Sequence, residues 1–327
     1  MRRARIGLLG LICLAVTPVH SAPIAGSLIS WGQDYTNAPS GSDFVAIASG
    51  SAHFTALRSN GTVVSWGNYN NHNTYGETTA PTGTFTAIAA GYHVNLAIRT
   101  DGSLVGWGDN AYGQINVPVG NNFVAVATEY THSLALRSDG SLVAWGASPY
   151  GEGNVPIGNN FVAIATGYRH DLALRSDGSL VAWGANFVGE LNVPTGHDFV
   201  AITTGANFDI ALRSDGSLVA WGQSGEGELN VPSGHDFVSI AAGPKTGYAI
   251  RSDGSAVAWG WTAYGQATIP TYVNGSDIRN YYAIASADTS TVAIVYAYAI
   301  PETGAVLLTA VGLASMGTLA VRRRSRG

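Results

Sequence analysis

The chain has 327 residues, with 16 Lys and Arg against 21 Asp and Glu, and a formal net charge of −5 at pH 7. Nine of the basic and 20 of the acidic residues lie between residues 23 and 299, which gives that stretch a net charge near −11. A nucleic acid site needs clustered basic residues, so this balance argues against a nucleic acid partner. The one cysteine, Cys13, lies near the start, and the rest of the chain can form neither a disulfide nor a reactive thiol.

Residues 1–22 have the pattern of a secretory signal peptide. Three arginines stand near the start, an apolar run extends from Ile6 to Val16, and small residues precede a cleavage site after Ser21 or Ala22. Cys13 follows Ile12 rather than a small residue, which argues against a lipoprotein anchor. We therefore expect an exported protein, at the cell surface or outside the cell.

One unit recurs between residues 27 and 297. An Asp-Gly or Asn-Gly pair stands between two apolar runs, and a Trp-Gly pair follows five or six residues later. Such a pair predicts a β-hairpin with a two-residue type I′ turn. A second apolar run lies upstream, so each unit supplies three strands, for example 161–165, 171–175 and 179–183.

The spacing of the units predicts a ring. Trp107, Trp145, Trp183, Trp221 and Trp259 follow one another at intervals of 38 residues, a period typical of solenoids and propellers. The array opens with a lone third strand at 27–32 and ends with a first and a second strand within 281–297. We predict an all-β, seven-bladed β-propeller of short three-stranded blades over residues 23–299. Strand 27–32 would complete the blade of 281–297 and leave no free sheet edge.

The residues that recur in every unit are interpreted as structural. Both faces of each first strand are apolar, so the tryptophans are expected to pack between blades. One arginine precedes each turn and is expected to be a solvated charge. His53, His132 and His170 occupy matching positions, too far apart to share a zinc ion at bonds of about 2 Å. A role in packing or in satisfying a loop is favoured for them, and neither a metal site, a cofactor nor a catalytic constellation is expected.

The segment "HSLALRSDGSLVAWGASPYGEGNVP" at 132–156 resembles the regulator-of-chromosome-condensation repeat family. The resemblance covers about 27–297 and implies a propeller. The unit is shorter than the four-stranded blade of the eukaryotic members. It is more similar to the unit of secreted β-lactamase-inhibitory proteins, whose seven blades have three strands. Because one fold hosts many roles, this resemblance alone implies no activity.

Two kinds of loop are expected on opposite faces of the ring. The turns repeat "RSDGS", whereas the loops between the first and second strands vary and share a face with the linkers after each Trp-Gly. Aromatic residues on loops of a rigid scaffold are typical of binding surfaces. The predicted binding residues are Tyr92, Tyr130, Tyr168, Arg169 and Phe208 in the loops and Tyr112, Tyr150, Phe187, Trp261 and Tyr264 in the linkers. For Tyr92, Tyr130, Tyr168 and Phe208 the resemblance to the inhibitors implies the same role, although the loops at Pro244 and Asp288 lack the aromatic residue.

Residues 300–327 are expected to form a sorting signal with a membrane segment. Ile300, Pro301, Glu302, Thr303 and Gly304 resemble the sortase pentapeptide, and also the Pro-Glu-Pro-type signal that exosortases read. An apolar run of 17 residues follows at 305–321 and spans roughly 26 Å as a helix. Four arginines end the chain, as expected for a cytoplasmic tail. A plain membrane anchor is the alternative.

These features favour an exported or surface-attached, non-enzymatic propeller that binds a protein or glycan partner through its aromatic loop face. An inhibitor of a secreted hydrolase is one alternative. A polysaccharide-active enzyme at the channel mouth is another, with Glu129 and Asp171 as its first candidate carboxylates. Guanine-nucleotide exchange, the activity of eukaryotic members, ranks last, because an exported chain would not meet a small GTPase.

Overall fold

The computed structural model describes residues 17–18, 26–32, 37–67, 74–273, 276–277, 280–296 and 308–309. The predicted sorting motif, Ile300 to Gly304, lies outside the described residues, as does nearly all of the predicted signal peptide. Among the described residues there is no helix with the length and hydrophobicity that a membrane crossing requires.

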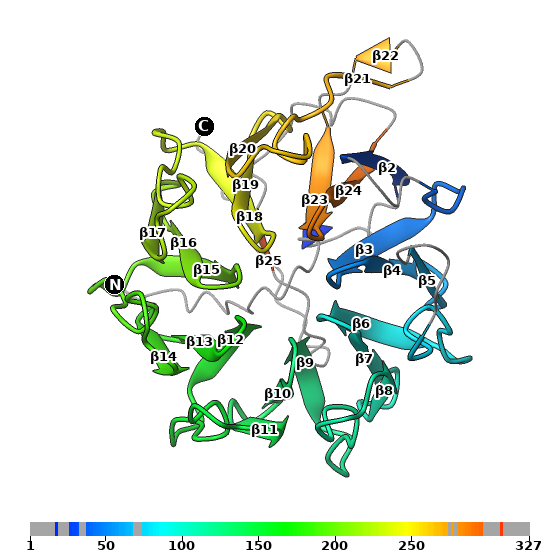
Figure 1. Cartoon of the computed structure of the whole chain (residues 1–327), viewed down its shortest axis with the longest axis vertical. Helices are drawn as coiled ribbons and strands as arrows, with labels where there is room; N and C mark the ends of the chain where they lie inside the picture. The colour runs from blue at the N-terminus through cyan, green and yellow to red at the C-terminus, as the bar shows by residue number, and fades with distance from the viewer. Residues whose placement is uncertain are drawn as a thin grey trace, which may run out of the picture.

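Seven antiparallel sheets of three strands stand around a central axis (Figure 1). In each sheet the first strand lies nearest the axis and the third lies at the rim. Blades 1 to 3 comprise β3 (Phe44–Ser49), β4 (His53–Arg58) and β5 (Val63–Gly67); β6 (Phe85–Ala90), β7 (Val94–Arg99) and β8 (Leu104–Gly108); and β9 (Phe123–Thr128), β10 (His132–Arg137) and β11 (Leu142–Gly146). Blades 4 to 6 comprise β12 (Phe161–Thr166), β13 (His170–Arg175) and β14 (Leu180–Gly184); β15 (Phe199–Thr204), β16 (Phe208–Arg213) and β17 (Leu218–Gly222); and β18 (Phe237–Ala242), β19 (Thr246–Arg251) and β20 (Ala256–Gly260).

Blade 7 joins the two ends of the repeat region. It comprises β23 (Tyr281–Ser286), β24 (Ser290–Val295) and β2 (Ser27–Gly32), in the order β2-β24-β23. The register runs from Ser27 opposite Val295 to Gly32 opposite Ser290. The predicted seven-bladed ring and its closure by strand 27–32 are therefore confirmed. The remaining described strands form two short two-stranded sheets outside the blades. β1 (Thr17–Pro18) pairs with β25 (Leu308–Thr309), and β21 (Tyr272–Val273) pairs with β22 (Ser276–Asp277).

The hydrophobic core lies between neighbouring blades. Between blades 3 and 4, for example, Leu134 and Leu136 pack with Phe161, Ile164 and Trp183. Six of the seven repeat tryptophans are buried, as predicted, and Trp145 is half-buried. Since each sheet is covered on both sides by apolar neighbours, its strands are apolar on both faces.

The hairpin turns differ from the predicted two-residue type I′ geometry. In blade 4 the Gly178 N–H donates to the Arg175 carbonyl at 2.9 Å, and the Arg175 N–H donates to the Ser179 carbonyl at 2.9 Å. The loop is thus three residues long, Ser-Asp-Gly, as in a type I turn followed by a glycine bulge. The Asp177 carboxylate accepts hydrogen bonds from the Ser179 N–H at 2.9 Å and its hydroxyl at 2.7 Å. These bonds favour the longer loop and lower the pKa of Asp177.

The turn glycines also connect the blades. At all seven junctions the carbonyl of the turn glycine, or of its counterpart Gly26, accepts a hydrogen bond from the first residue of the next inner strand at 2.8–3.2 Å. Gly178 shows why no larger residue fits: its φ is +82°, and a Cβ would lie 2.3 Å from the His197 carbonyl oxygen. The turn face, which repeats the same residues, therefore forms a belt, a closed series of equivalent hydrogen bonds between neighbouring blades.

The repeat arginines are not simply solvated, which corrects the sequence interpretation. Each guanidinium lies 4.4–5.5 Å from the ring centroid of the phenylalanine that opens the first strand of its own blade. Three of them also pair with an aspartate at 2.5–2.7 Å: Arg58 with Asp43, Arg213 with Asp198, and Arg251 with Asp236. The arginine side chains therefore cover the ends of the inter-blade core.

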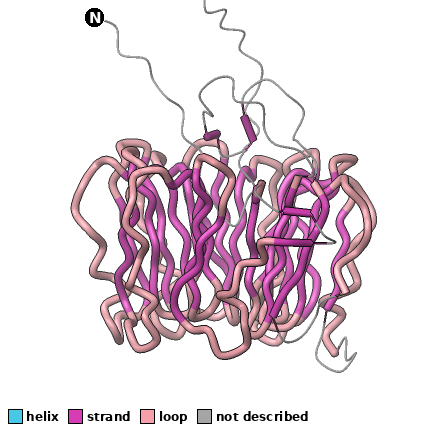
Figure 2. The backbone as a smooth tube through the Cα atoms, turned by 90° about the horizontal axis from the view of Figure 1, so that it is seen from above, coloured by secondary structure: helices cyan, strands magenta, loops and turns pink. Residues whose placement is uncertain are grey.

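The strands of the seven blades run from one face of the ring to the other, the hairpin loops and turns lie on the two faces, and the linkers between blades cross the outside of the ring (Figure 2). A residue at a strand end can therefore be assigned to a face from its place in the repeat.

Closure predicts that Trp31 stabilises the whole ring. The indole is buried and its Nε1 donates to the Gln266 carbonyl at 2.8 Å. We expect Trp31→Ala to lower the free energy of unfolding by ~3–5 kcal/mol, measured by urea denaturation. Trp145→Ala is the control, because that indole makes the same kind of bond to Gln114 at 2.8 Å but is half-exposed. An equal or smaller loss for Trp31→Ala would contradict a closure that depends on β2.

Candidate functional site

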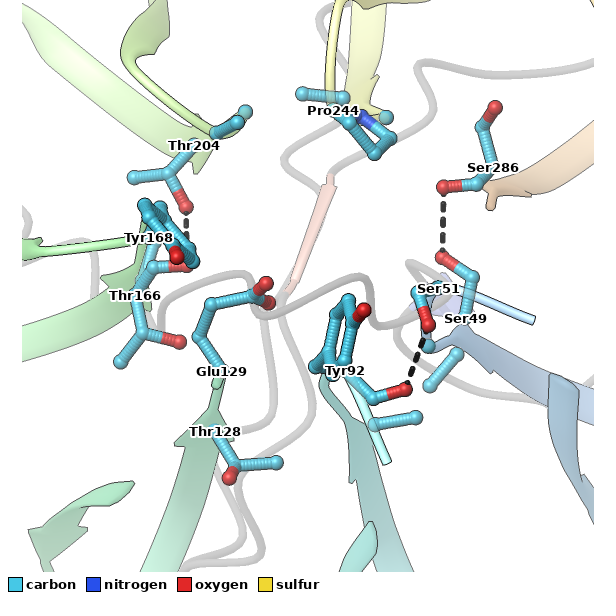
Figure 3. A pocket seen from close by; sticks show the side chains of 18 of the residues that line it. Ser49, Ser51, Tyr92, Thr128, Glu129, Thr166, Tyr168, Thr204, Pro244 and Ser286 are labelled. Carbon is cyan, nitrogen blue, oxygen red and sulfur yellow. Dashed lines mark hydrogen bonds between the residues drawn. The ribbon is translucent and has the colours of Figure 1, made fainter. Parts of the chain in front are cut away.

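The loops between the first and second strands of all seven blades meet around the axis and line one pocket (Figure 3). Backbone hydrogen bonds connect neighbouring loops. The Ser51 N–H donates to the Tyr92 carbonyl at 3.2 Å, and the Asp288 N–H donates to the Ser51 carbonyl at 3.2 Å, which joins blades 7, 1 and 2. These loops form the loop face, with the pocket as its channel mouth.

The linkers that follow each Trp-Gly begin on this same face. The Asp109 N–H donates to the His93 carbonyl at 2.9 Å, and the Ala185 N–H donates to the Arg169 carbonyl at 2.8 Å. The predicted assignment of variable loops and linkers to one face, and of the Asp-Gly turns to the other, is therefore confirmed.

Most of the predicted aromatic residues form one continuous surface, the aromatic strip. Its members come from the loops and linkers of blades 1 to 4 and are Tyr75, Tyr92, His93, Tyr112, Tyr130, Tyr150, Tyr168, Arg169 and Phe187. The Tyr130 ring is central, with its centroid 4.9 Å from that of Tyr92 and 5.6 Å from that of Tyr168. The Arg169 guanidinium continues the strip, 4.7 Å from both the Tyr168 and the Tyr150 ring centroids.

The strip is exposed along its outer members and half-buried at its centre, where Tyr130, Tyr168 and Arg169 lie. The exposed fraction is 38% for Tyr92, 45% for Tyr112, 40% for Tyr150 and 63% for Phe187. Trp261 and Tyr264 form a separate pair on blade 6, with ring centroids 4.9 Å apart and the Lys245 Nζ 5.0 Å from the Trp261 centroid. The structure thus brings seven of the ten predicted binding residues into one strip and places two in a second patch.

Phe208, the tenth predicted residue, is buried in the core, so its assignment to the exposed loop was wrong. It opens strand β16, at the position that His170 holds in β13, and is 1% exposed. A Cβ on Gly205 would lie 2.0 Å from the Phe208 ring, which shows how closely the loop covers it. The strand starts one residue earlier than expected, and this register turns the side chain inward.

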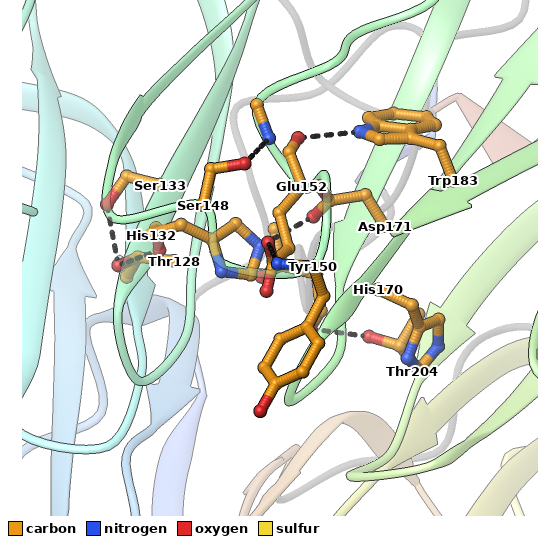
Figure 4. Close-up of polar contacts among 12 residues, drawn as sticks. Thr128, His132, Ser133, Ser148, Tyr150, Glu152, His170, Asp171, Trp183 and Thr204 are labelled. Atoms are coloured by element: carbon orange, nitrogen blue, oxygen red, sulfur yellow. Dashed lines mark hydrogen bonds and ion pairs between the residues drawn. The ribbon is translucent and has the colours of Figure 1, made fainter. Parts of the chain in front are cut away.

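The recurring histidines connect neighbouring blades (Figure 4). His132 Nε2 lies 2.9 Å from Asp171 Oδ1, and His170 Nε2 lies 2.9 Å from Asp209 Oδ1, each pair bridging one blade to the next. All four side chains are buried. The packing role expected for the histidines is thus supported, and Asp171 is not a carboxylate of the channel mouth.

The partner decides the charge of each histidine. His53 Nε2 lies 3.0 Å from Asn95 Oδ1, and burial, against this hydrogen bond, lowers the pKa of His53 to about 4. Burial also acts on His132, but the charge and hydrogen bond of Asp171 outweigh it, and the pKa of His132 is raised. The main difference between the two sites is that Asp171 offers a carboxylate to His132 where Asn95 offers an amide to His53.

The Glu or Gln that follows each linker glycine is buried and structural. In blade 3, for example, Glu152 Oε2 accepts the Tyr150 N–H at 2.9 Å, and the Glu152 carbonyl accepts the Trp183 Nε1–H of blade 4 at 2.8 Å (Figure 4). Equivalent bonds recur with Gln114 and Glu190. These linkers are thereby fixed to the next blade, and the residue before the glycine, Tyr112, Tyr150 or Val188, is held at the surface.

Glu129 is an exception within the repeat and lines the channel mouth. Five of the other six blades have glycine at its position: Gly50, Gly91, Gly167, Gly205 and Gly243. Burial raises the pKa of Glu129 to about 7, with opposing effects from His132 and His170 and a reinforcing one from Asp288. In Figure 3 its carboxylate points into the pocket. Among the described residues no group of three or more His, Cys, Asp and Glu could hold a metal ion.

Residues 44–76, 85–114 and 161–190 match the Regulator of chromosome condensation (RCC1) repeat. They correspond to blades 1, 2 and 4, each with its following linker. No curated protein matches the chain.

Solved propellers share the fold. Prp20p from Saccharomyces cerevisiae is 16% identical, with a TM-score of 0.68 over 89% of this chain and 94% of that chain. Human WBSCR16 is 16% identical, with a TM-score of 0.66 over 84% and 100% of the two chains. The CRINKLY WD40 ectodomain of the Arabidopsis thaliana receptor kinase ACR4 is 19% identical, with a TM-score of 0.62 over 77% and 93%. At such identities the similarity establishes an RCC1-like propeller and no particular partner.

The residue paired with each inter-blade histidine should determine the direction in which the histidine's pKa is shifted. Asp171→Asn should lower the pKa of His132, because burial is then opposed only by the weaker effects of Glu152 and Glu129, and Asn95→Asp should raise the pKa of His53 from about 4. Titration of the imidazole resonances by NMR measures both. Because the folded-state pKa of His132 is raised, its contribution to stability is present below pH 6.5 and is lost as the pH rises through that pKa. An unchanged His132 pKa in folded Asp171→Asn would show that the carboxylate is not the cause.

Proposed function

We propose that this protein is an exported or surface-attached, non-enzymatic binding propeller that captures a protein or glycan partner through the aromatic strip. The observation that carries the proposal is the continuity of the strip. Rings from three loops and four linkers lie within 4.4–5.9 Å of their neighbours on one face of a rigid ring. Solvent-accessible Tyr, Phe and Arg side chains in such a cluster are typical of binding hot spots.

The contrast between the two faces of the ring supports the same function. The turn face repeats one set of hydrogen bonds between blades, whereas the loop face changes its residues from blade to blade. Extra variation on a closed scaffold costs little stability and serves recognition. An inhibitor of a secreted hydrolase would use this same loop face.

Export is supported by sequence alone. The basic and apolar pattern of residues 1–22, and the motif, apolar run and arginines of residues 300–327, are the features that support it. The proposal therefore includes a place outside the cytoplasm, with membrane attachment through the C-terminal segment before processing.

Catalysis on a polysaccharide is the weaker alternative. Glycoside hydrolysis uses a pair of carboxylates, and the pair suggested by the sequence does not share a site: Asp171 is buried against His132, while Glu129 lines the channel mouth. The proposed pair of Glu129 with Asp171 is thus corrected.

Replacing Tyr92, Tyr130 and Tyr168 with Ala should weaken capture of the partner about 100-fold or more, because hot-spot residues each contribute about 2 kcal/mol. The full protein is used to retain the partner from the native envelope or medium, and the dissociation constant of that partner is then measured for each variant. The matched control is Val119→Ala with Ile157→Ala, since these exposed apolar residues precede first strands and so belong to the turn-face side. Equal loss in both variants, or none in the triple variant, would contradict a role for the strip.

A further inference from the structure

Two acidic residues break the repeat pattern at the channel mouth. Glu129 stands where other blades have glycine, or alanine in blade 7, and Asp288 stands where blades 2, 3 and 4 have tyrosine. Both line the same pocket, although they come from blades 3 and 7. Since neither residue is needed to build a blade, their presence at one cavity calls for a reason other than packing.

The pocket around them suits a positive charge. Tyr92 and Tyr168 contribute to its wall, along with hydroxyl groups such as those of Ser49, Thr166 and Thr204. Among the described residues that line it, none is a lysine or an arginine. An aromatic wall with carboxylates at hand is the environment that binds an ammonium or guanidinium group by charge and by cation–π contact.

We propose that the channel mouth binds one cationic side chain, a lysine or an arginine, of a protein partner whose surrounding surface covers the aromatic strip. This inference rests on the proposed function and names its partner class. The pocket adjoins the strip directly, because Tyr92 and Tyr168 belong to both. A single partner can therefore insert a basic side chain at the axis while it contacts the strip beside it.

Charge and composition favour a protein over a glycan. The stretch 23–299 carries nine basic and 20 acidic residues, so its field attracts a basic partner. Tyrosine and arginine are the residues enriched where proteins meet. A neutral glycan has no positive charge to pair with the Glu129 carboxylate.

Several charged and titratable groups surround Glu129. His132 and His170 oppose the raised pKa of Glu129, and Asp288 reinforces it. The adjoining loops add His93, whose pKa burial lowers, and Arg169, a permanent cation. As the pH rises from 6 to 8, Glu129 gains its negative charge near pH 7. Binding of a cation should therefore strengthen over this range.

A pair of isosteric probes tests the inference on the full protein. N-acetyl-arginine methylamide carries the cation, N-acetyl-citrulline methylamide has the same shape without the charge, and glucosamine represents an amino sugar. Binding is followed by NMR shifts of the loop-face amides at pH 8 and pH 6. We expect saturable binding of the arginine probe, at least tenfold weaker binding of the citrulline probe, and weaker arginine binding at pH 6.

Two variants test whether the arginine probe binds at the channel mouth. Glu129→Gly restores the residue that five other blades have, so it is compatible with the fold, and it should reduce arginine-probe binding at least tenfold. Glu226→Gln removes an exposed carboxylate that does not line the pocket and should leave binding unchanged. Equal binding of the arginine and citrulline probes, no saturable shift, or full binding by Glu129→Gly would overturn the inference, and preference for glucosamine would replace the protein partner by a glycan. If the probes fail while the triple tyrosine variant still loses its partner, the inference falls and the proposed function stands.

Discussion

The pairing of β2 with β24 is the contact on which the rest of the molecule depends. It joins residues separated by most of the chain, from Ser27 opposite Val295 to Gly32 opposite Ser290. The Gly26 carbonyl then accepts the Phe44 N–H at 3.2 Å and so completes the belt of turn-face bonds. Without this closure an array of blades would end in free edges, and the seven loops would not surround one channel mouth.

A closed ring of repeats separates stability from recognition. The inter-blade bonds from the turn glycines, the tryptophan indoles and the linker Glu or Gln recur around the ring and fix each blade against its neighbour. Because these bonds lie in the strands, turns and linker ends, the tips of the loops are free to differ. The aromatic strip, Glu129 and Asp288 all occupy that free set of positions.

The sequence predicts the ring because its signals are periodic and redundant. The equal spacing of the tryptophans and the complementary strands at 27–32 and 281–297 allow a single closed arrangement. The sequence does not reveal the inward turn of Phe208, because a shift of one residue at a strand start decides whether a side chain faces the core or the solvent. The same limit applies to Asp171, whose partner His132 lies on the neighbouring blade and 39 residues earlier.

Contacts between blades explain the other differences. The three-residue turn follows from the Asp177 carboxylate bonding to Ser179, a choice that the pair Asp-Gly does not settle alone. The buried role of Glu152 depends on an indole from the next blade. The sequence predicts that the residues of the aromatic strip lie on one face of the ring. It does not predict that their rings contact one another, because those contacts depend on how far neighbouring blades are rotated. Aligning the seven loops by position would, however, have singled out Glu129 as the exception.

Native-state hydrogen exchange tests the closure most directly. Closure by β2 predicts that the amides within 27–32 that donate to β24 exchange as slowly as those of β24 and β13, and only through global unfolding, since β2 is an integral strand of blade 7. Fast exchange of these amides, while the other six blades stay protected, would show that the ring does not depend on its N-terminal strand and would contradict closure by β2.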